Sequence, residues 1–179
     1  QSMLDEHGIP YTGSNAVTSA FAMNKYLSGE YFKRKGFATP LSFFVTKGEW
    51  SRNKTDVFSR IKYYLTFPFV VKPNDSGSSV GVSVVRNWTE FMDAMYRVFT
   101  VSDHALIQNY IPGREVSCAV LDRGVPGSEY ALMPSEIIPR NNVFFDYEEK
   151  YGAHGSHEFT PARFAHEDIA EIQRVAVEV

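Results

Sequence analysis

The chain has 179 residues with 18 Lys and Arg against 21 Asp and Glu, a formal net charge of −3, which argues against nucleic acid as the main partner. Its 44% hydrophobic content is enough to bury a core in one domain or two small lobes. No apolar run approaches the roughly 18 residues that span a bilayer, and the one cysteine requires no oxidising compartment, so we expect a cytoplasmic protein that does not enter membranes.

Both ends of the chain show helical patterns. Residues 1–8 are typical of the last turns of a helix closed by Gly8. At the other end, Ile169, Ile172, Ala176 and Val179 recur at helical spacing without a stop signal. We therefore expect a fragment of a longer protein.

The first predicted elements after Gly8 are a strand and a helix. Residues 9–11 favour a short strand, and Ser14 or Asn15 can cap a helix that runs through Ala20, Met23 and Tyr26. This prediction places Lys25 near the end of that helix.

A second helical stretch reaches Lys35 and stops at Gly36. The basic run at residues 33–35 is better explained as charge that complements the helix dipole than as a binding patch. After Pro40, the apolar residues 41–45 indicate a strand.

Residues 69–84 contain two β-branched segments around a Gly/Ser cluster, which predicts a hairpin with Lys72 at the end of its first strand. A glycine-rich loop lets backbone N–H groups approach an anion closely, and three serine hydroxyls add donors. The order of a P-loop is absent. The pattern indicates a flexible flap that handles phosphate; a mobile surface hairpin is the alternative.

The next segment predicts an amphipathic helix. Asn87 and Glu90 have the spacing of a capping box. One apolar face, which we assign to the core, then follows: Phe91, Met92, Met95, Val98 and Phe99.

Residues 105–121 indicate a strand, a Pro112-Gly113 turn and a second strand. Alternation puts Cys118 on the face of Val116 and Val120, where we expect a small buried core residue.

Residues 129–139 form another extended run, and residues 151–161 an irregular stretch rich in Gly and His. A metal site at His154, His157 and His166 is disfavoured, because glycines interrupt the spacing and no acidic or cysteine ligand completes a zinc set. Solvated loop histidines are the preferred interpretation.

The segment 144–151 places Lys150 among aromatic and acidic residues. This arrangement is unusual for packing, but it suits a cation held near a transferring phosphoryl group.

Six motifs in this order resemble the D-alanine–D-alanine ligase family of ATP-grasp enzymes. They lie at residues 9–14, 23–25, 72–81, 111–116, 134–137 and 146–151. The resemblance implies an ATP-grasp fold of the α+β (α/β) class, in which two α+β lobes clasp a nucleotide, here incomplete at both ends. Residues 1–14 would end an N-terminal substrate domain, 15–108 would form the central lobe with its flap, and 109–179 would begin the C-terminal lobe.

The resemblance also implies roles for particular residues. Lys25 and Lys72 match lysines that contact the α- and β-phosphates, and Gly77, Ser78, Ser79 and Val80 match the flap over the triphosphate. Gln108, Asn109, Tyr110 and Ile111 match the hinge that lines the adenine pocket, and Glu115 matches the carboxylate that binds the ribose. Phe145 stands where the family often has an aromatic hydroxyl in the nucleotide pocket. Lys150 matches the cation at the γ-phosphate, and Tyr151 and Ser78 match a network that orients substrates.

The implied reaction joins two D-alanine molecules with ATP, through an acyl phosphate, for peptidoglycan precursors in the bacterial cytoplasm. Tyr151 favours D-alanine over D-lactate as second substrate. The family's Mg²⁺ (or Mn²⁺) ligands would lie beyond Val179, so we assign no metal ligand here. The full-length protein would be a homodimer through its N-terminal part.

The hinge residues differ from the family pattern. Gln108 and Asn109 replace an acidic residue and a lysine, so the contact to the adenine amino group is expected to change, although an amide oxygen can accept a hydrogen bond.

The alternatives to a D-alanine–D-alanine ligase are another ATP-grasp carboxylate–amine ligase, a nucleotide-binding module without catalysis and, least favoured, a purely structural α+β domain.

Overall fold

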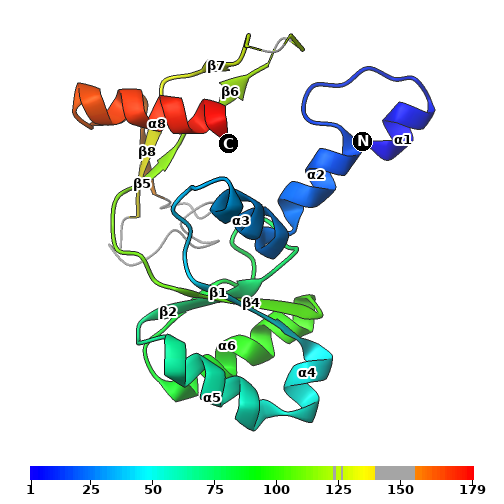
Figure 1. The fold of residues 1–179 in the computed structure, drawn as a ribbon, viewed down its shortest axis with the longest axis vertical. Helices are drawn as coiled ribbons and strands as arrows, with labels where there is room; N and C mark the ends of the chain where they lie inside the picture. The colour runs from blue at the N-terminus through cyan, green and yellow to red at the C-terminus, as the bar shows by residue number, and fades with distance from the viewer. Residues whose placement is uncertain (123, 126, 140–155) are drawn as a thin grey trace. The chain divides into compact units, whose positions relative to one another are not determined.

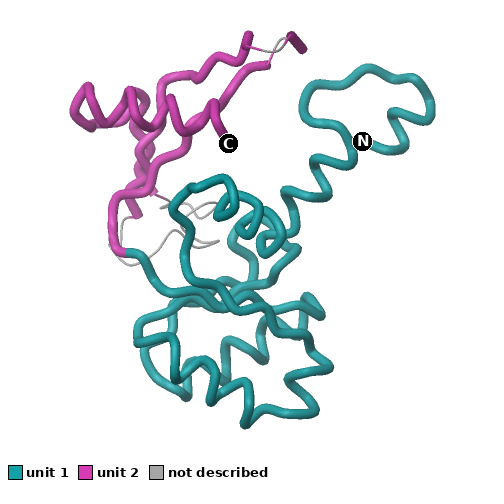
Figure 2. Tube along the Cα trace, viewed as in Figure 1, with its two compact units in different colours: residues 1–111 teal, residues 112–179 magenta. Residues whose placement is uncertain are grey.

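The computed structural model describes residues 1–122, 124–125, 127–139 and 156–179 (Figure 1). It forms two compact units, residues 1–111 and residues 112–179 (Figure 2). Each unit combines helices with antiparallel strands, which confirms the predicted α+β class. The assignment of residues 1–14, 15–108 and 109–179 to a substrate domain and two lobes stays a prediction.

A four-stranded antiparallel sheet organises the first unit, in the order β1-β4-β2-β3. The strands are β1 (Ser42–Thr46), β2 (Phe69–Pro73), β3 (Ser83–Val85) and β4 (His104–Asn109). One side of the sheet carries α4 (Lys47–Arg52), α5 (Lys54–Tyr64) and α6 (Trp88–Val101), and the other carries α3 (Lys25–Arg34) (Figure 1).

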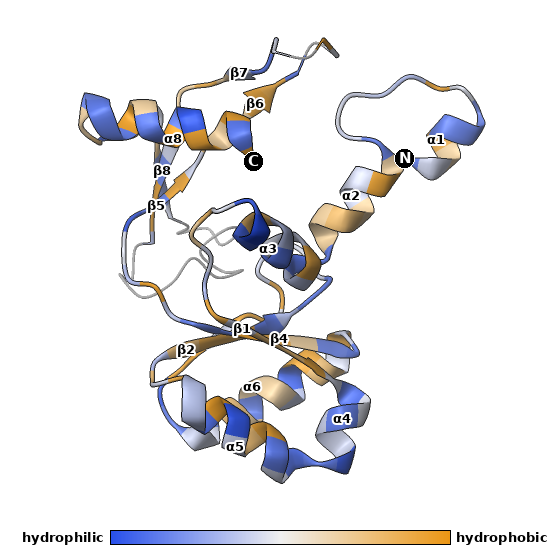
Figure 3. Cartoon of the chain, viewed as in Figure 1, coloured by the Kyte–Doolittle hydropathy of each residue, from blue (hydrophilic) through white to orange (hydrophobic). Residues whose placement is uncertain are grey.

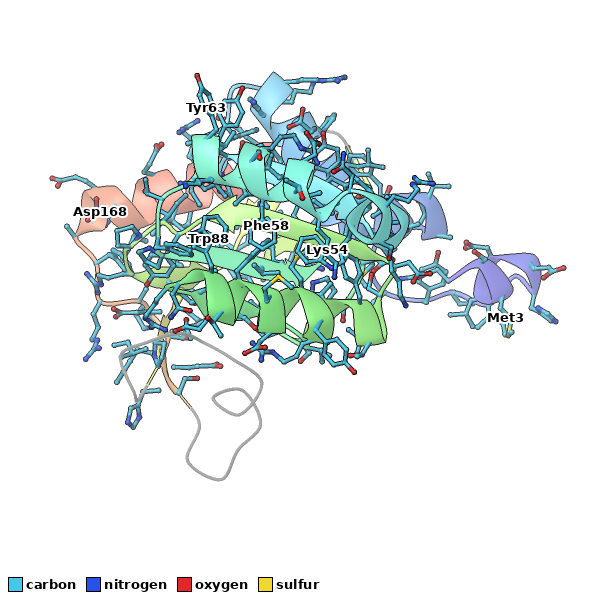
Figure 4. The ribbon with its side chains drawn as sticks, turned by 90° about the horizontal axis from the view of Figure 1, so that it is seen from below. Met3, Lys54, Phe58, Tyr63, Trp88 and Asp168 are labelled. Carbon is cyan, nitrogen blue, oxygen red and sulfur yellow. The ribbon has the colours of Figure 1, made fainter. Side chains whose placement is uncertain are left out.

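The core lies between the sheet and the helices α4, α5 and α6. Strand alternation places Phe69 and Val71 in this core and leaves Lys72 on the opposite face. Figure 3 shows the strands as mostly hydrophobic, whereas the helices mix hydrophobic and hydrophilic residues. Aromatic rings join the helices, and Phe58 and Trp88, with centroids 5.2 Å apart, lie between α5 and α6 (Figure 4).

The N-terminal segment corrects two predictions. Residues 9–11 form no strand, because Pro10 has no N–H to donate to a sheet ladder. The helix capped by Asn15, α2 (Ala16–Met23), ends before Tyr26. α1 (Ser2–Glu6) precedes it, and Gly8 adopts a left-handed φ of 63°, as the predicted glycine cap requires.

Asn24 separates α2 from α3, so Lys25 begins a new helix and does not lie within the last turn of the predicted one. Its side chain accepts a hydrogen bond from the Leu27 N–H at 3.1 Å, so it is the N-cap of a new helix. Lys25 is therefore the first residue of α3. The predicted stop at Gly36 is confirmed, with φ at 91°.

The predicted capping box at the start of α6 is confirmed. The Glu90 N–H donates to the Asn87 side chain at 2.9 Å, and the Glu90 carboxylate accepts from the Arg86 N–H at 2.8 Å. The predicted core face is correct except at Met92, which is 37% exposed because it lies at the edge of the apolar stripe. The sequence analysis missed α4 and α5, whose N-caps are Thr46 and Asn53.

The second unit contains small sheets and one long helix. β5 (Glu115–Ser117), β8 (Ser135–Ile138) and β9 (His157–Phe159) form one sheet, and β6 (Val120–Leu121) pairs with β7 (Tyr130–Ala131). α8 (His166–Glu178) confirms the predicted C-terminal helix. No helix among the described residues is long and apolar enough to cross a membrane.

The structure of this unit differs from three further predictions. The strands flanking Pro112-Gly113 belong to different sheets, so the turn connects two units. β9 lies within the stretch predicted to be irregular, since pairing with β8 orders its backbone. Cys118 is partly buried but is not a core residue, because it lies in the link between β5 and β6, outside both sheets.

Candidate functional site

Two partly buried lysines lie on the sheet face opposite the core. Lys72 comes from β2, and Lys25 from the first turn of α3. Burial, followed by the charge of Lys25, lowers the pKa of Lys72 to about 8. Burial also lowers the pKa of Lys25, and the charge of Asp75 opposes that effect. No described carboxylate forms a salt bridge with either lysine, so the pair is suited to an anionic ligand that brings several negative charges.

Backbone carbonyl groups hold the Lys25 side chain. Its ammonium donates to the carbonyl oxygen of Asn74 at 3.3 Å and to that of Ser76. Both carbonyls belong to the segment that directly follows Lys72 and Pro73. The lysine from α3 is thus tied to the start of the Gly/Ser loop.

The Gly/Ser loop contains a tight turn at residues 77–80. The Val80 N–H donates to the Gly77 carbonyl at 3.1 Å, and Ser78 and Ser79 have φ of 52° and 56°. These values match a type I′ turn, in which both central residues are left-handed. Non-glycine residues avoid that region by about 1–2 kcal/mol each, and such strain is concentrated at ligand clamps. Gly77 and Val80 are exposed, and both serines are partly exposed.

Polar contacts fix the first residues of this loop. Asp75 accepts a hydrogen bond from the Ser102 hydroxyl at 2.7 Å and lies 3.6 Å from Nδ1 of His104. The Ser102 hydroxyl and His104 hold the pKa of the Asp75 carboxyl below its usual range. The sequence analysis missed this cluster, because a single Asp, Ser and His at these spacings form no recognised motif.

The hinge residues continue from the same sheet. Gln108 is buried and donates from Nε2 to the Ser42 hydroxyl at 2.7 Å, while the Asn109 N–H donates to the Leu41 carbonyl at 3.1 Å. Asn109 Oδ1 is buried and has no hydrogen-bond partner among the described residues. A buried acceptor without a donor is costly and calls for a ligand or water. Tyr110 is partly buried and Ile111 exposed.

The remaining predicted site residues lie outside this cluster. Glu115 begins β5 in the second unit and is exposed. Phe145, Lys150 and Tyr151 lie outside the described residues. The structure therefore brings together Lys25, Lys72, the loop 74–82 and, on the same sheet, Gln108. Their roles in binding stay predictions.

A buried ion cluster organises the sheet that carries Glu115. The carboxylate of Glu136, 2% exposed, accepts from Arg114 at 2.8 and 2.6 Å and from Arg163 at 3.2 Å. Each guanidinium also stacks on a phenylalanine ring, at 3.8 Å. The cluster fixes the residue before Glu115.

In the described part of the chain, no three His, Cys, Asp or Glu residues are grouped so that they could hold a metal ion. His157 lies on β9 and His166 begins α8. The expectation that metal ligands lie beyond residue 179 stays a prediction.

Comparison with known proteins identifies relatives. Residues 31–179 match the family described as D-ala D-ala ligase C-terminus. The chain is 35% identical over 179 residues to a D-alanine–D-alanine ligase of Leptospira interrogans, with 99% of this chain and 50% of the relative covered. It is 34% identical over 177 residues to that of Halalkalibacterium halodurans, with 99% and 55% covered. The chain spans about half the length of these curated relatives.

Solved structures agree with this relationship. VanG D-Ala:D-Ser ligase from Enterococcus faecalis superposes with a TM-score of 0.84 at 30% identity, covering 98% of this chain and 49% of that one. D-alanine–D-alanine ligase from Bacillus anthracis, complexed with ATP, gives 0.70 at 26% identity, with 99% and 50% covered. The fold is therefore that of the ATP-grasp region of these ligases, and the chain belongs to the D-alanine–D-alanine ligase family.

Proposed function

We propose that this chain is the nucleotide-binding part of an ATP-dependent ligase that joins two D-alanine molecules. The γ-phosphate of ATP would pass to the carboxylate of one D-alanine, and the amine of the second would displace phosphate from the resulting acyl phosphate. The observation that supports this most directly is the Lys25–Lys72 pair, which forms no salt bridge with a described carboxylate and lies beside the left-handed Ser78-Ser79 turn.

The lysine pair suits the phosphates of a nucleotide. The charge of Lys25 lowers the proton affinity of Lys72, and an anion bound beside the two ammonium groups would offset that effect. Preorganised cations lower the barrier of phosphoryl transfer because they face the charge of the transferring group. We assign the α- and β-phosphates to Lys25 and Lys72, and the γ-phosphate to Lys150.

Other residues would hold the remaining parts of the nucleotide and substrates. Backbone N–H groups of residues 77–80 would close over the triphosphate, and residues 108–111 with Phe145 would contact adenine. Asn109 Oδ1, buried without a donor, is suited to an amino group of the base. Glu115 would accept from the ribose hydroxyls, and Ser78 and Tyr151 would orient D-alanine.

Magnesium would neutralise phosphate charge, but the described residues do not form a site for it. The resemblance to the family implies ligands beyond residue 179, and we assign no step of this chain's residues to the metal.

The direct test uses the full-length protein with ATP, Mg²⁺ and D-alanine, and measures phosphate release beside the dipeptide formed. We expect equal amounts of both products, with loss of turnover in Lys150→Ala and full turnover in Lys62→Ala, which removes an exposed lysine from α5. ATP binding without turnover that depends on D-alanine would favour the nucleotide-binding module without catalysis.

A second candidate is ligation of D-alanine to D-serine or to another amine, because the VanG D-Ala:D-Ser ligase superposes at a TM-score of 0.84. Competition between D-alanine, D-serine and D-lactate as second substrate would separate these activities. We expect the D-alanine dipeptide to predominate, and a predominant D-alanyl-D-serine product would assign the second activity.

A further inference from the structure

Asn74 has a buried polar side chain that contacts the first turn of α3, the turn that carries Lys25. It is 1% exposed and follows Lys72 and Pro73 at the end of β2. Buried amides are costly unless their donor and acceptor atoms are paired. The partners of Asn74 therefore show what it holds.

All four polar groups of Asn74 have partners. Its Oδ1 accepts from the Tyr26 N–H at 2.9 Å, and its Nδ2 donates to Oδ1 of Asn24 at 3.0 Å. Its carbonyl accepts from the Lys25 N–H at 3.1 Å, and its own N–H donates to the His104 carbonyl at 3.0 Å.

These bonds join the first turn of α3 to the end of β2. Tyr26 and Lys25 carry N–H groups that a helix leaves unpaired in its first turn, and Asn74 satisfies both. Asn24 Oδ1 is shared, because it also accepts from the Leu27 N–H at 3.1 Å. Asn74 thus fixes where α3 begins relative to the strand.

We propose that Asn74 is a positioning residue that holds Lys25 beside Lys72, so that both ammonium groups face the same phosphates. The inference rests on the proposed function. It adds a residue that contacts no substrate and that acts through the geometry of the lysine pair.

The side-chain chemistry at this position is specific. Alanine removes both the acceptor for Tyr26 and the donor to Asn24. Aspartate keeps the shape but places an oxygen against Asn24 Oδ1, and Asn24 cannot turn its amide without losing the Leu27 cap. Neither substitution can reproduce the bridge.

The proton affinity of Lys72 reports the position of Lys25. The described charged groups around the pair are Lys25 on α3, Asp75 in the loop and His104 on β4. If Asn74→Ala releases α3, the Lys25 charge moves away and the pKa of Lys72 rises from about 8 by the smaller part of its shift, because burial is the larger cause. A loss of general stability alone would not move it.

The experiment compares the full-length protein with Asn74→Ala, Asn74→Leu and Asn87→Ala, none of which adds a charge beside the lysines. Asn87→Ala is the matched control, because it removes an asparagine cap of the same kind at the start of α6. Lys72 is titrated by NMR of ¹³C-labelled lysine, assigned through Lys72→Met, and ATP affinity is measured by calorimetry near neutral pH.

We expect both Asn74 variants to raise the Lys72 midpoint and to weaken ATP binding roughly tenfold, while Asn87→Ala changes neither. Folding is checked by circular dichroism, and Asn74→Leu, which is neutral and similar in shape, decides if Asn74→Ala does not fold. A midpoint unchanged in a folded Asn74 variant that binds ATP normally overturns the inference. Wild-type protein that does not bind ATP refutes the proposed function instead, whatever its lysine titration.

Discussion

The two faces of the four-stranded sheet differ in what they bury. On one face, Val45, Phe69, Val71 and Ile107 pack against three helices in an aromatic core. On the other, the residues that alternate with them include Ser42, Lys72 and Gln108. The register places Phe44, Leu106 and Lys72 in one row across this second face, and Ser42, Gln108 and Val70 in the next.

From this comparison we propose that one face of the sheet serves stability and the other serves binding. The buried cluster on the core face consists of hydrophobic residues, so its contribution comes from burial and packing. The opposite face keeps the partly buried ammonium of Lys72, whose burial is costly unless a negative charge pairs with it.

Phe91→Ala on the core face should have the largest effect. Phe91 is fully buried, and its ring lies 5.3–5.7 Å from those of Phe58, Phe69, Trp50 and Trp88. We expect a loss of about 3–5 kcal/mol in the free energy of unfolding, measured by urea denaturation. Tyr96→Ala, on the same helix but 75% exposed, is the control and should change it by less than about 0.5 kcal/mol. Equal losses in the two variants would contradict the assignment of the core.

Lys72→Met on the opposite face should show the reverse behaviour. Removing a partly buried ammonium relieves its desolvation, so we expect unfolding free energy to be unchanged or higher. ATP affinity should fall about 10- to 100-fold, because a charged hydrogen bond to phosphate is lost. Lys62→Met, an exposed lysine on α5, should leave both quantities unchanged. Destabilisation by Lys72→Met with normal ATP affinity would show that the two faces are not separated.

The core face was largely predictable from sequence, whereas the binding face was only partly so. The 3.6-residue period after Asn87 and the alternation around Lys72 carry local information, and both gave correct elements. The meeting of Lys25 with Lys72 depends on Asn24 starting a new helix and on Asn74, 50 residues later, closing onto it. Such a long-range pair has no local pattern. The Gly/Ser hairpin pointed to Lys72, but only the resemblance pointed to Lys25, and the role of the two asparagines was missed.

The flap offers a comparison between two glycines. Gly81 has φ of 72°, and a Cβ there would lie 2.9 Å from Pro73 Cγ, whereas a Cβ on Gly77 would meet nothing within 4 Å. We expect Gly81→Ala to destabilise the hairpin by about 2 kcal/mol. Gly77→Ala should keep normal stability but bind ATP more weakly, because its methyl group would hold the phosphates away. Denaturation and calorimetry on both variants check this, and normal ATP affinity in Gly77→Ala would exclude close approach at that residue.

The pH dependence of ATP affinity should follow Lys72. Below pH 8 the ammonium is charged with or without ligand, so affinity is flat. Above the pKa of about 8, binding must take up a proton, since phosphate raises the pKa in the complex. Affinity should then fall by up to about tenfold per pH unit. Calorimetry in buffers of different ionisation enthalpy measures the proton uptake, which Lys72→Met should abolish. Proton uptake that persists in that variant would assign the titration to another group.

The smallest effect is expected at Asn109. Its Oδ1 is buried without a described donor, so Asn109→Ala removes a cost as well as a contact, and the free energy of unfolding should change by less than about 1 kcal/mol. ATP affinity should fall only a few-fold, because one neutral hydrogen bond to the base is lost. Discrimination between ATP and GTP should fall with it, since an acceptor favours the amino group of adenine over the carbonyl of guanine. Affinities for both nucleotides, measured by calorimetry, decide the point. An unchanged ATP-to-GTP ratio would mean that base selection lies elsewhere on the hinge, and the backbone groups of residues 108–111 would then be the next to examine.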